Sequence, residues 1–194
     1  MVRPREFDRE EVLQKAIRVF WRKGFAATST DELLQEMGIG RQSLYNAFGD
    51  KRQLYLEVLR SYMEGTFGGH LERLNKPKSP LQGIRRLLLG LAAPDDDERA
   101  LGCLGVGSAG EFGTRDPELL AQLQSGSQFL RAQLVKRIRE GQESGEVDPS
   151  MDAQKAAEFV QMVMNGLQLA ARTGADVRYM HDMANFAIDR LKAD

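Results

Sequence analysis

Polar side chains suited to contact nucleic acid are concentrated between residues 28 and 51. Arg41 and Gln42 are adjacent, and each can form two hydrogen bonds to a purine edge, to guanine and to adenine respectively. Hydroxyls and one ammonium at nearby positions have the chemistry that contacts phosphate oxygens. The sequence therefore predicts a set of DNA contacts made of Thr28, Ser29, Arg41, Gln42, Ser43, Tyr45, Asn46 and Lys51.

Two short helices and a tight turn must position these side chains. Ser29 is expected to cap the first helix, with Glu32 reaching back to the helix start, and the free amides there can take a phosphate. A Gly-Ile-Gly turn at residues 38–40 leads into a helix over residues 41–48 with one apolar face. Each polar residue taken singly fits a solvated surface. Together with the turn and the capped helix, they favour a helix-turn-helix whose second helix reads the major groove.

A wider motif surrounds this segment: Phe20-Trp21-Arg22-Lys23-Gly24-Phe25, then Thr28-Ser29, Gly38-Ile39, Leu44-Tyr45, Phe48 and Lys51. Over roughly the first 60 residues this pattern resembles the TetR family of bacterial repressors. Gly40 departs from it, because Ser or Thr is commoner there, although Gly is tolerated at a helix cap. The resemblance implies about nine helices, a homodimer with its interface in the C-terminal part, a small-molecule inducer pocket and double-stranded operator DNA as partner.

The whole chain is predicted to be all-α, because apolar residues recur at three- and four-residue spacing almost throughout. We expect a helix-turn-helix domain over residues 1–50, continuous with a helical ligand-binding and dimerisation domain over residues 51–194. Helices are expected from a cap at Asp8 to Gly24, from Asp50 to about 62, over 81–91, and from caps at Asp116, Asp152 and Asp176 to about 143, 172 and 192. Residues 65–80 are interrupted by glycines and a proline, residues 95–98 suit a solvated acidic loop, and residues 102–113 suit an irregular segment or a glycine-weakened helix.

Aromatic and sulfur-containing side chains of the C-terminal part suit an adaptable apolar cavity, although at helical spacing such residues also form ordinary core. The small residues of the last two helices allow close helix approach, as in a four-helix dimer interface or, equally, in an intramolecular core. The predicted ligand contacts are Phe67, Leu88, Cys103, Phe112, Phe129 and Met162.

Cys103 is the single cysteine, so an internal disulfide is excluded. The segment Gly102-Cys103-Leu104 resembles that of a TetR-like subset, some of whose members sense oxidants or electrophiles through this thiol. A buried cysteine acting as a small apolar residue is the simpler interpretation, because only Arg99 lies within four residues to lower its pKa. A thiol-sensing repressor is therefore kept as the alternative to reversible ligand binding.

Enzymatic chemistry has little support. Residues 105–110 match G-x-G-x-x-G, but neither a preceding strand nor an acidic residue near position 130 accompanies them, so a dinucleotide site is not expected. With two histidines and one cysteine, no metal-spaced cluster is present, and no cofactor is predicted. An all-helical enzyme or interaction protein that binds no DNA is the alternative from another class.

Composition excludes a membrane protein. The chain is 42% hydrophobic and 28% charged with a net charge of −1, and it has no apolar run near the ~20 residues that span a bilayer. The N-terminal sequence MVRPREFDREE lacks the apolar stretch of a signal peptide. A cytoplasmic location is therefore expected.

Overall fold

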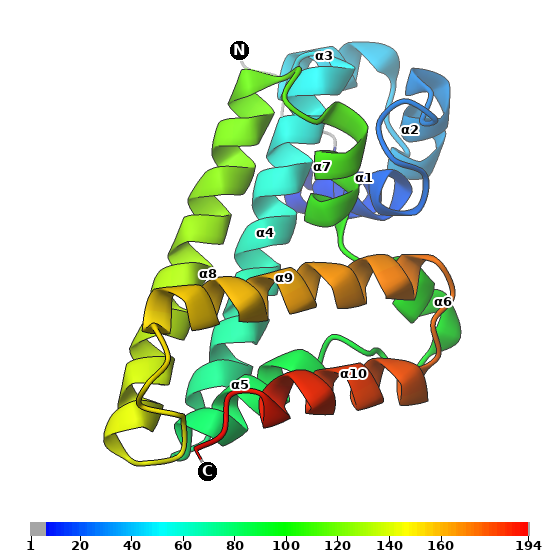
Figure 1. The fold of residues 1–194 in the computed structure, drawn as a ribbon. Coiled ribbons are helices and arrows are strands. Elements are labelled where there is room, and N and C mark those ends of the chain that lie inside the picture. The colour runs from blue at the N-terminus through cyan, green and yellow to red at the C-terminus, as the bar shows by residue number, and fades with distance from the viewer. Residues whose placement is uncertain (1–6, 194) are drawn as a thin grey trace.

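The computed structural model describes residues 7–193 and is helical throughout them, apart from turns and one isolated β-bridge. The N-terminal helices form a compact group at one end of two long helices, and the C-terminal helices pack at the other (Figure 1). Residues 7–193 contain ten helices: α1 (Arg9–Lys23), α2 (Thr30–Met37), α3 (Arg41–Phe48), α4 (Lys51–Asn75), α5 (Pro80–Leu89), α6 (Asp96–Ala100), α7 (Leu104–Phe112), α8 (Pro117–Glu143), α9 (Ala153–Arg172) and α10 (Val177–Asp189). Residues 1–6 and residue 194 of the predicted domains lie outside this description.

Side-chain caps set the starts of the N-terminal helices. Asp8 accepts hydrogen bonds from two amides of the first turn of α1, and Ser29 and Asp50 each accept one at the starts of α2 and α4. Each cap satisfies donors that would otherwise lack a helical partner. Glu32 does not complete a capping box, because its carboxylate pairs with the Lys23 ammonium.

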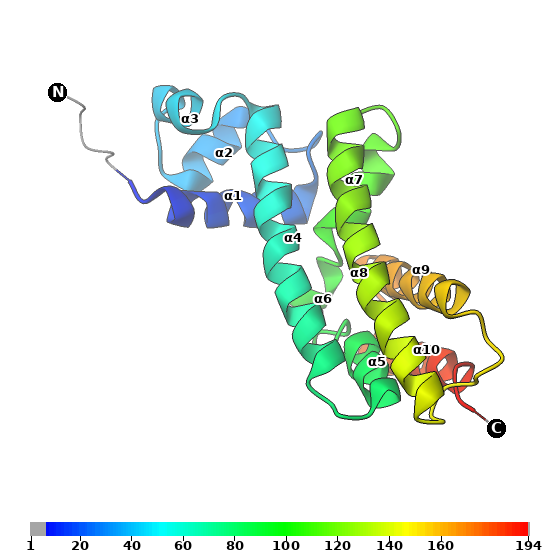
Figure 2. The same cartoon turned by 90° about the vertical axis from the view of Figure 1, so that its left-hand side faces the viewer.

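Helix α4 is longer than the sequence pattern indicates. It runs for 25 residues through three glycines and ends at Asn75. Glycine has a low helix propensity, so packing against α5 and α8 must stabilise this part of α4 (Figure 2). The close approach to α8 depends on Gly126, where a Cβ atom would lie 2.3 Å from the Met63 methyl and 2.7 Å from the Phe67 ring.

Two apolar clusters fill the molecule. One joins α1–α3 to the first half of α4 and includes Leu104 of α7 and Leu119 of α8. The other joins the end of α4 to α5, α8, α9 and α10. The core around the helix-turn-helix therefore extends past residue 50 to Leu59 and is built partly by C-terminal helices.

Two expected segments differ in the structure, and a third takes one of its two expected forms. Residues 95–98 are not a loop: Asp95 caps the short helix α6. Residues 104–112 form helix α7, the helical one of the two expected forms, so the G-x-G-x-x-G glycines lack the strand–turn–helix geometry of a dinucleotide site. The last helix ends at Asp189, before the expected end near residue 192, and Lys192 forms an antiparallel bridge with Val147.

Helices α9 and α10 run antiparallel at one side of the molecule, across α8 and α5 (Figure 1). Among the described helices, none is long and apolar enough to cross a membrane.

Candidate DNA-binding surface and ligand cavity

The exposed face of α3 carries most of the predicted DNA contacts. Arg41, Gln42, Tyr45 and Asn46 are exposed, and Ser43 is half-buried. Leu44 and Phe48 fix this orientation, because both are buried in the N-terminal core. These polar side chains therefore project from a helix that is held by two buried apolar residues one turn apart.

Two of these side chains, Arg41 and Gln42, form contacts with neighbouring polar residues. The Arg41 guanidinium pairs with Asp31 of α2, and both are exposed. The Gln42 amide donates a 3.0 Å hydrogen bond to the Asn46 side-chain oxygen, one turn later. Both contacts leave the hydrogen-bonding groups at the surface, where they can exchange partners.

The residues predicted to contact phosphate differ in how exposed they are. Ser29 is exposed at the start of α2. Thr28 is 1% exposed, and its hydroxyl donates a 2.6 Å hydrogen bond to the Gly24 carbonyl, so it stabilises the loop between α1 and α2 rather than facing solvent. Lys51 is half-buried, with its ammonium 4.2 Å from the centre of the Phe25 ring. Partial burial lowers the pKa of Lys51, and nearby Glu111 opposes that shift.

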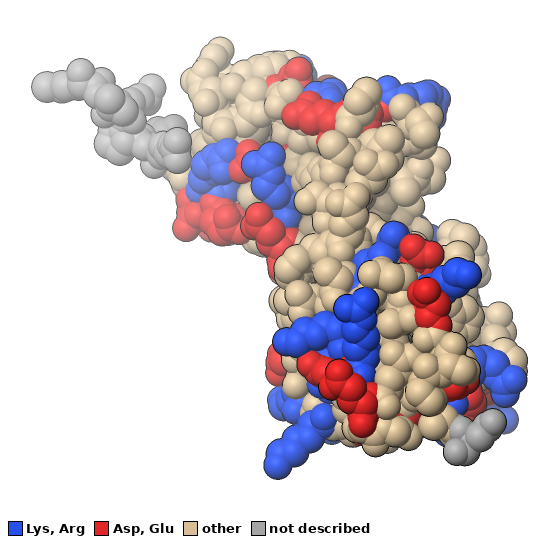
Figure 3. All heavy atoms as spheres, turned by 60° about the vertical axis from the view of Figure 1, so that its left-hand side comes forward, with Lys and Arg blue, Asp and Glu red and all other residues tan. Residues whose placement is uncertain are grey.

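The face that carries α4 and α8 is not a basic patch. Figure 3 shows Lys and Arg side chains beside Asp and Glu side chains at several places on it, with broad uncharged areas between. On α8 no charged residue occurs from Leu119 to Leu130. The positive charges available for DNA are therefore individual side chains around α3, not a continuous basic surface on this side.

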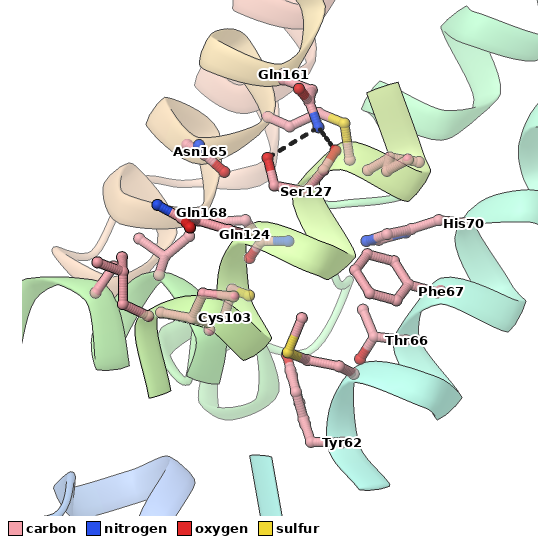
Figure 4. Close-up of a pocket in the computed structure, with 18 residues that line it drawn as sticks. Tyr62, Thr66, Phe67, His70, Cys103, Gln124, Ser127, Gln161, Asn165 and Gln168 are labelled. Atoms are coloured by element: carbon pink, nitrogen blue, oxygen red, sulfur yellow. Dashed lines mark hydrogen bonds between the residues drawn. The ribbon is translucent and has the colours of Figure 1, made fainter. Parts of the chain in front are cut away.

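A cavity of about 290 Å³ lies between α4, α7, α8 and α9. Its lining joins apolar side chains to neutral polar ones, and Figure 4 shows Tyr62, Thr66, Phe67 and His70 reaching it from α4. None of the described residues that line it is Asp, Glu, Lys or Arg. The lining is Tyr62, Met63, Thr66, Phe67, His70, Cys103, Gly105, Val106, Ala109, Leu120, Leu123, Gln124, Ser127, Leu130, Gln161, Met164, Asn165 and Gln168.

Two of the six predicted ligand contacts line this cavity, Phe67 and Cys103. Leu88 is 1% exposed in the C-terminal core, and Phe112 packs on Phe25 and Tyr55. Phe129 and Met162 are 46% and 66% exposed and do not line the cavity. The prediction chose large apolar side chains, and this criterion does not distinguish residues that line the cavity from residues of the core or the surface.

The polar residues that line the cavity were not predicted from the sequence. On α4 they lie at every fourth position, 62, 66 and 70, and on α9 they lie at 161, 165 and 168. This spacing places each set on one face of its helix, and that pattern in the sequence could have identified them. Gln161 is held in place, because its amide donates a 2.7 Å hydrogen bond to the Ser127 carbonyl and its oxygen accepts one from Arg131.

Burial changes the protonation of two lining residues. Burial lowers the pKa of His70 to about 4, with a further contribution from the positive charge of Arg73, so the imidazole is neutral at pH 7. Burial likewise raises the pKa of Tyr62, and its neighbour Cys103 adds to the shift. Both groups therefore face the cavity in their uncharged forms.

Helix α7 connects the cavity to the helix-turn-helix. Gly105, Val106 and Ala109 face the cavity, while Glu111 accepts hydrogen bonds of 2.9 and 2.5 Å from the amides of Phe25 and Ala26. These amides belong to the loop between α1 and α2. One carboxylate of α7 therefore holds the loop that precedes α2.

A second connection runs from α9 to the end of α1. Arg172 donates hydrogen bonds of 3.2 and 2.7 Å to the carbonyls of Trp21 and Arg22 and one of 3.2 Å to Leu101. The Trp21 indole in turn donates to the Gly102 carbonyl at 3.2 Å. Gly102 has φ of +60°, and a Cβ there would lie 2.8 Å from the Gln168 carbonyl oxygen, so this junction requires glycine.

Helices α9 and α10 expose large apolar side chains. The exposed ones are Met162 and Leu169 on α9 and Tyr179, Met183 and Phe186 on α10. Residues 162, 166 and 169 repeat the spacing of 179, 183 and 186, which places each set along one helix face. An exposed apolar face of this kind is typical of an interaction surface.

Comparison with known proteins matches both parts of the chain to one family. Residues 12–58 match the family described as "Bacterial regulatory proteins, tetR family", and residues 83–187 match "Tetracyclin repressor-like, C-terminal domain". The chain is 34% identical over 193 residues to the uncharacterized HTH-type transcriptional regulator YezE of Bacillus subtilis, covering 98% of this chain and 100% of that protein. It is 26% identical to the HTH-type transcriptional repressor ComR of Escherichia coli, covering 94% and 88% of the two chains.

A solved structure extends the likeness to a DNA complex. A cysteine-substituted mutant of the TetR family transcriptional regulator CifR, in complex with 26-bp double-strand operator DNA, superposes with a TM-score of 0.85 at 27% identity. The match covers 97% of this chain and 99% of that one. The chain therefore belongs to the TetR family of helix-turn-helix transcriptional regulators, which bind DNA and are not enzymes.

Proposed function

We propose that this protein is a homodimeric repressor that binds a palindromic operator through α3 and is released by a small molecule in the cavity. The exposed polar face of α3 carries this proposal, because Arg41 and Gln42 project from a helix whose apolar residues are anchored in the core. The CifR complex with operator DNA supports the use of this fold on a duplex. Arg41 and Gln42 then read base edges, and Ser29, Ser43, Tyr45 and Lys51 contact phosphates.

The dimer is proposed to form through the apolar faces of α9 and α10. Two copies of this helix pair, related by a two-fold axis, would bury Met162, Leu169, Tyr179, Met183 and Phe186 in a four-helix arrangement. Both α3 helices would then reach successive major grooves ~34–36 Å apart. Two-fold symmetry in the protein requires a palindromic operator.

Release is proposed to work through α7. A ligand that contacts Val106 and Ala109 favours one position of α7, and Glu111 passes that preference to the loop before α2. The ligand shifts the protein between DNA-binding and released states only by its difference in affinity for the two.

The DNA-binding part is tested by selecting duplexes from a random pool with the purified protein. We expect a palindromic consensus, and an affinity for it that falls steeply with salt, because each neutralised phosphate releases counterions. A salt-independent affinity, a consensus without two-fold symmetry, or a monomer in sedimentation at micromolar concentration would contradict the proposal.

A thiol-based trigger at Cys103 is the alternative that one observation favours, since this half-buried thiol lines the cavity. Reversible ligand binding predicts that Cys103→Ser keeps both operator binding and release. The measurement is operator release by wild type and Cys103→Ser after a mild electrophile, with mass spectrometry of the thiol. Loss of release in the variant, together with a modified Cys103 in wild type, would establish the thiol mechanism instead.

A further inference from the structure

The cavity combines an apolar body with hydrogen-bonding groups that carry no net charge. Met63, Phe67, Leu123 and Met164 provide apolar contact, and amides or hydroxyls are distributed among them. A volume of about 290 Å³ is at the lower end for small-molecule sites, which begin at ~300 Å³. A ligand held within this cavity alone is therefore a compact molecule, such as a single substituted ring.

His70 is the unsatisfied polar group of this lining. Its side chain is 8% exposed, and among the described residues no atom forms a hydrogen bond with its Nδ1. Figure 4 shows its ring extending from α4 into the space that Gln124 and Ser127 face from α8. Leaving a buried polar atom without a partner is unfavourable. Nδ1 itself is enclosed, so a ligand would reach the imidazole at the ring edge that points into the cavity in Figure 4.

Charged ligands meet no counter-charge in the lining. An ion that entered the cavity would lose its hydration among apolar and neutral side chains. Only a nearby opposite charge could offset the free-energy cost of this desolvation. Two cations lie close to the cavity without lining it: Arg131 bonds Gln161 and Glu158, and Arg73 lines an adjoining hollow that His70 also borders. Neutral His70 does not supply the missing charge.

We propose that the cavity selects an uncharged, compact, largely apolar ligand with a hydroxyl that forms a hydrogen bond with the His70 imidazole. A hydroxyl both donates and accepts, so it fits either tautomer of a neutral imidazole. The neighbouring amides of Gln124 and Asn165 can hold a second polar group of such a ligand. This inference rests on the proposed function, since it specifies the ligand of the same cavity.

The test uses three probes that share a 4-propylphenyl group and differ in the group opposite the propyl chain: 4-propylphenol, 4-propyltoluene and 4-propylbenzoate. Their affinities for the full-length protein are measured by calorimetry at pH 7.5 without DNA. We expect the phenol to bind roughly tenfold more tightly than the toluene, which is the gain from about one hydrogen bond, and the benzoate not to bind. A benzoate that binds most tightly, equal affinity for phenol and toluene, or no binding by any probe would overturn the inference.

His70→Phe assigns the preference to this side chain. The variant keeps an aromatic ring and removes both nitrogens, so phenol and toluene should bind alike, while the unliganded melting temperature stays unchanged or rises because an unpaired polar atom is lost. His181→Phe is the matched control, since His181 is the other histidine, lies on α10 and does not line the cavity. A phenol preference that persists in His70→Phe would overturn the assignment.

Operator release is measured separately with the same probes. If the phenol binds with the expected preference but leaves the operator complex intact, the ligand class stands and the proposed release mechanism fails. If the operator is not bound at all, the proposed regulator fails, while the binding measurements still decide the ligand class.

Discussion

Arg41 and Lys51 differ in what surrounds them, and this predicts different effects of their loss. Arg41 lies at the start of α3 with its guanidinium exposed, whereas the Lys51 ammonium lies over the Phe25 ring. Arg41→Ala should weaken binding to the selected operator by about 1–3 kcal/mol and relax its sequence preference, if Arg41 makes a bidentate contact to a base. Lys51→Ala should weaken binding to all sequences alike.

The measurement is a fluorescence-anisotropy titration of both variants with operator and with random duplex. Gln42→Ala should behave as Arg41→Ala does, and Tyr45→Phe as Lys51→Ala does if its hydroxyl meets only phosphate. Equal losses on operator and random duplex for Arg41→Ala would show that Arg41 is not a base reader.

His70 makes stability depend on pH. Its pKa is about 4 in the folded protein and about 6.5 in an unfolded chain, so between these values the unfolded state binds the extra proton. Stability is therefore lost as the pH falls below 6.5, and the contribution between pH 7.5 and pH 5 is about 2 kcal/mol. Urea unfolding of wild type and His70→Phe at both pH values measures it. The same loss in both proteins would show that His70 is not responsible.

Helix α7 is one of the elements that connect the two parts of the molecule. Its Glu111 carboxylate receives two backbone amides of the loop before α2, and its Ser108 hydroxyl lies 2.7 Å from the Tyr55 hydroxyl of α4. Helix α7 also lines the cavity, where Gly105 presents no side chain. The sequence of α7 therefore suits a helix that adjusts to a ligand more than one that only fills a core.

Glu111→Ala should release the loop before α2. Hydrogen exchange at the amides of Phe25 and Ala26 should become at least roughly tenfold faster, because hydrogen bonds to a charged group contribute about 1.5–3 kcal/mol each. The matched control is Glu143→Ala, at an exposed position at the end of α8. Unchanged exchange at both amides would exclude Glu111 as the connection.

At the scale of the whole molecule, the dimer decides whether two α3 helices can bind one duplex. Gly166 lies between Met162 and Leu169 on the exposed face of α9, and among the described residues no atom beyond its chain neighbours and the local helix backbone lies within 4 Å of a Cβ built there. Gly166→Arg should therefore leave the monomer folded but place a charge inside the proposed interface, which is strongly unfavourable without a partner.

We expect Gly166→Arg to sediment as a monomer and to bind the operator at least about a hundredfold more weakly, because the second half-site is no longer tethered. Gly68→Arg on α4 is the matched control, since a Cβ there also meets nothing within 4 Å. A Gly166→Arg protein that remains dimeric would place the interface elsewhere.

Local sequence signals were sufficient to predict the helical class and most helix ends. Caps at Asp8, Ser29, Asp116 and Asp152 are local signals that depend on a few adjacent residues, and the helices they begin start where the sequence predicts. The polar face of α3 was predictable for the same reason, because its apolar anchors lie one turn apart. The family resemblance also rested on short-range spacing.

Which residues line the cavity together depends on how distant segments of the chain pack. Phe67, Phe112 and Phe129 are equivalent in sequence terms, yet one lines the cavity, one packs on the N-terminal core and one is exposed. Helix α4 continues past its glycines because α5 and α8 pack against it, which no local propensity predicts. The environment of His70 depends on where α8 and α9 cross α4, and the Glu111 bonds join residues 85 and 86 positions apart. Contacts between distant segments follow from packing geometry, and a single sequence does not specify that geometry by its periodicity alone.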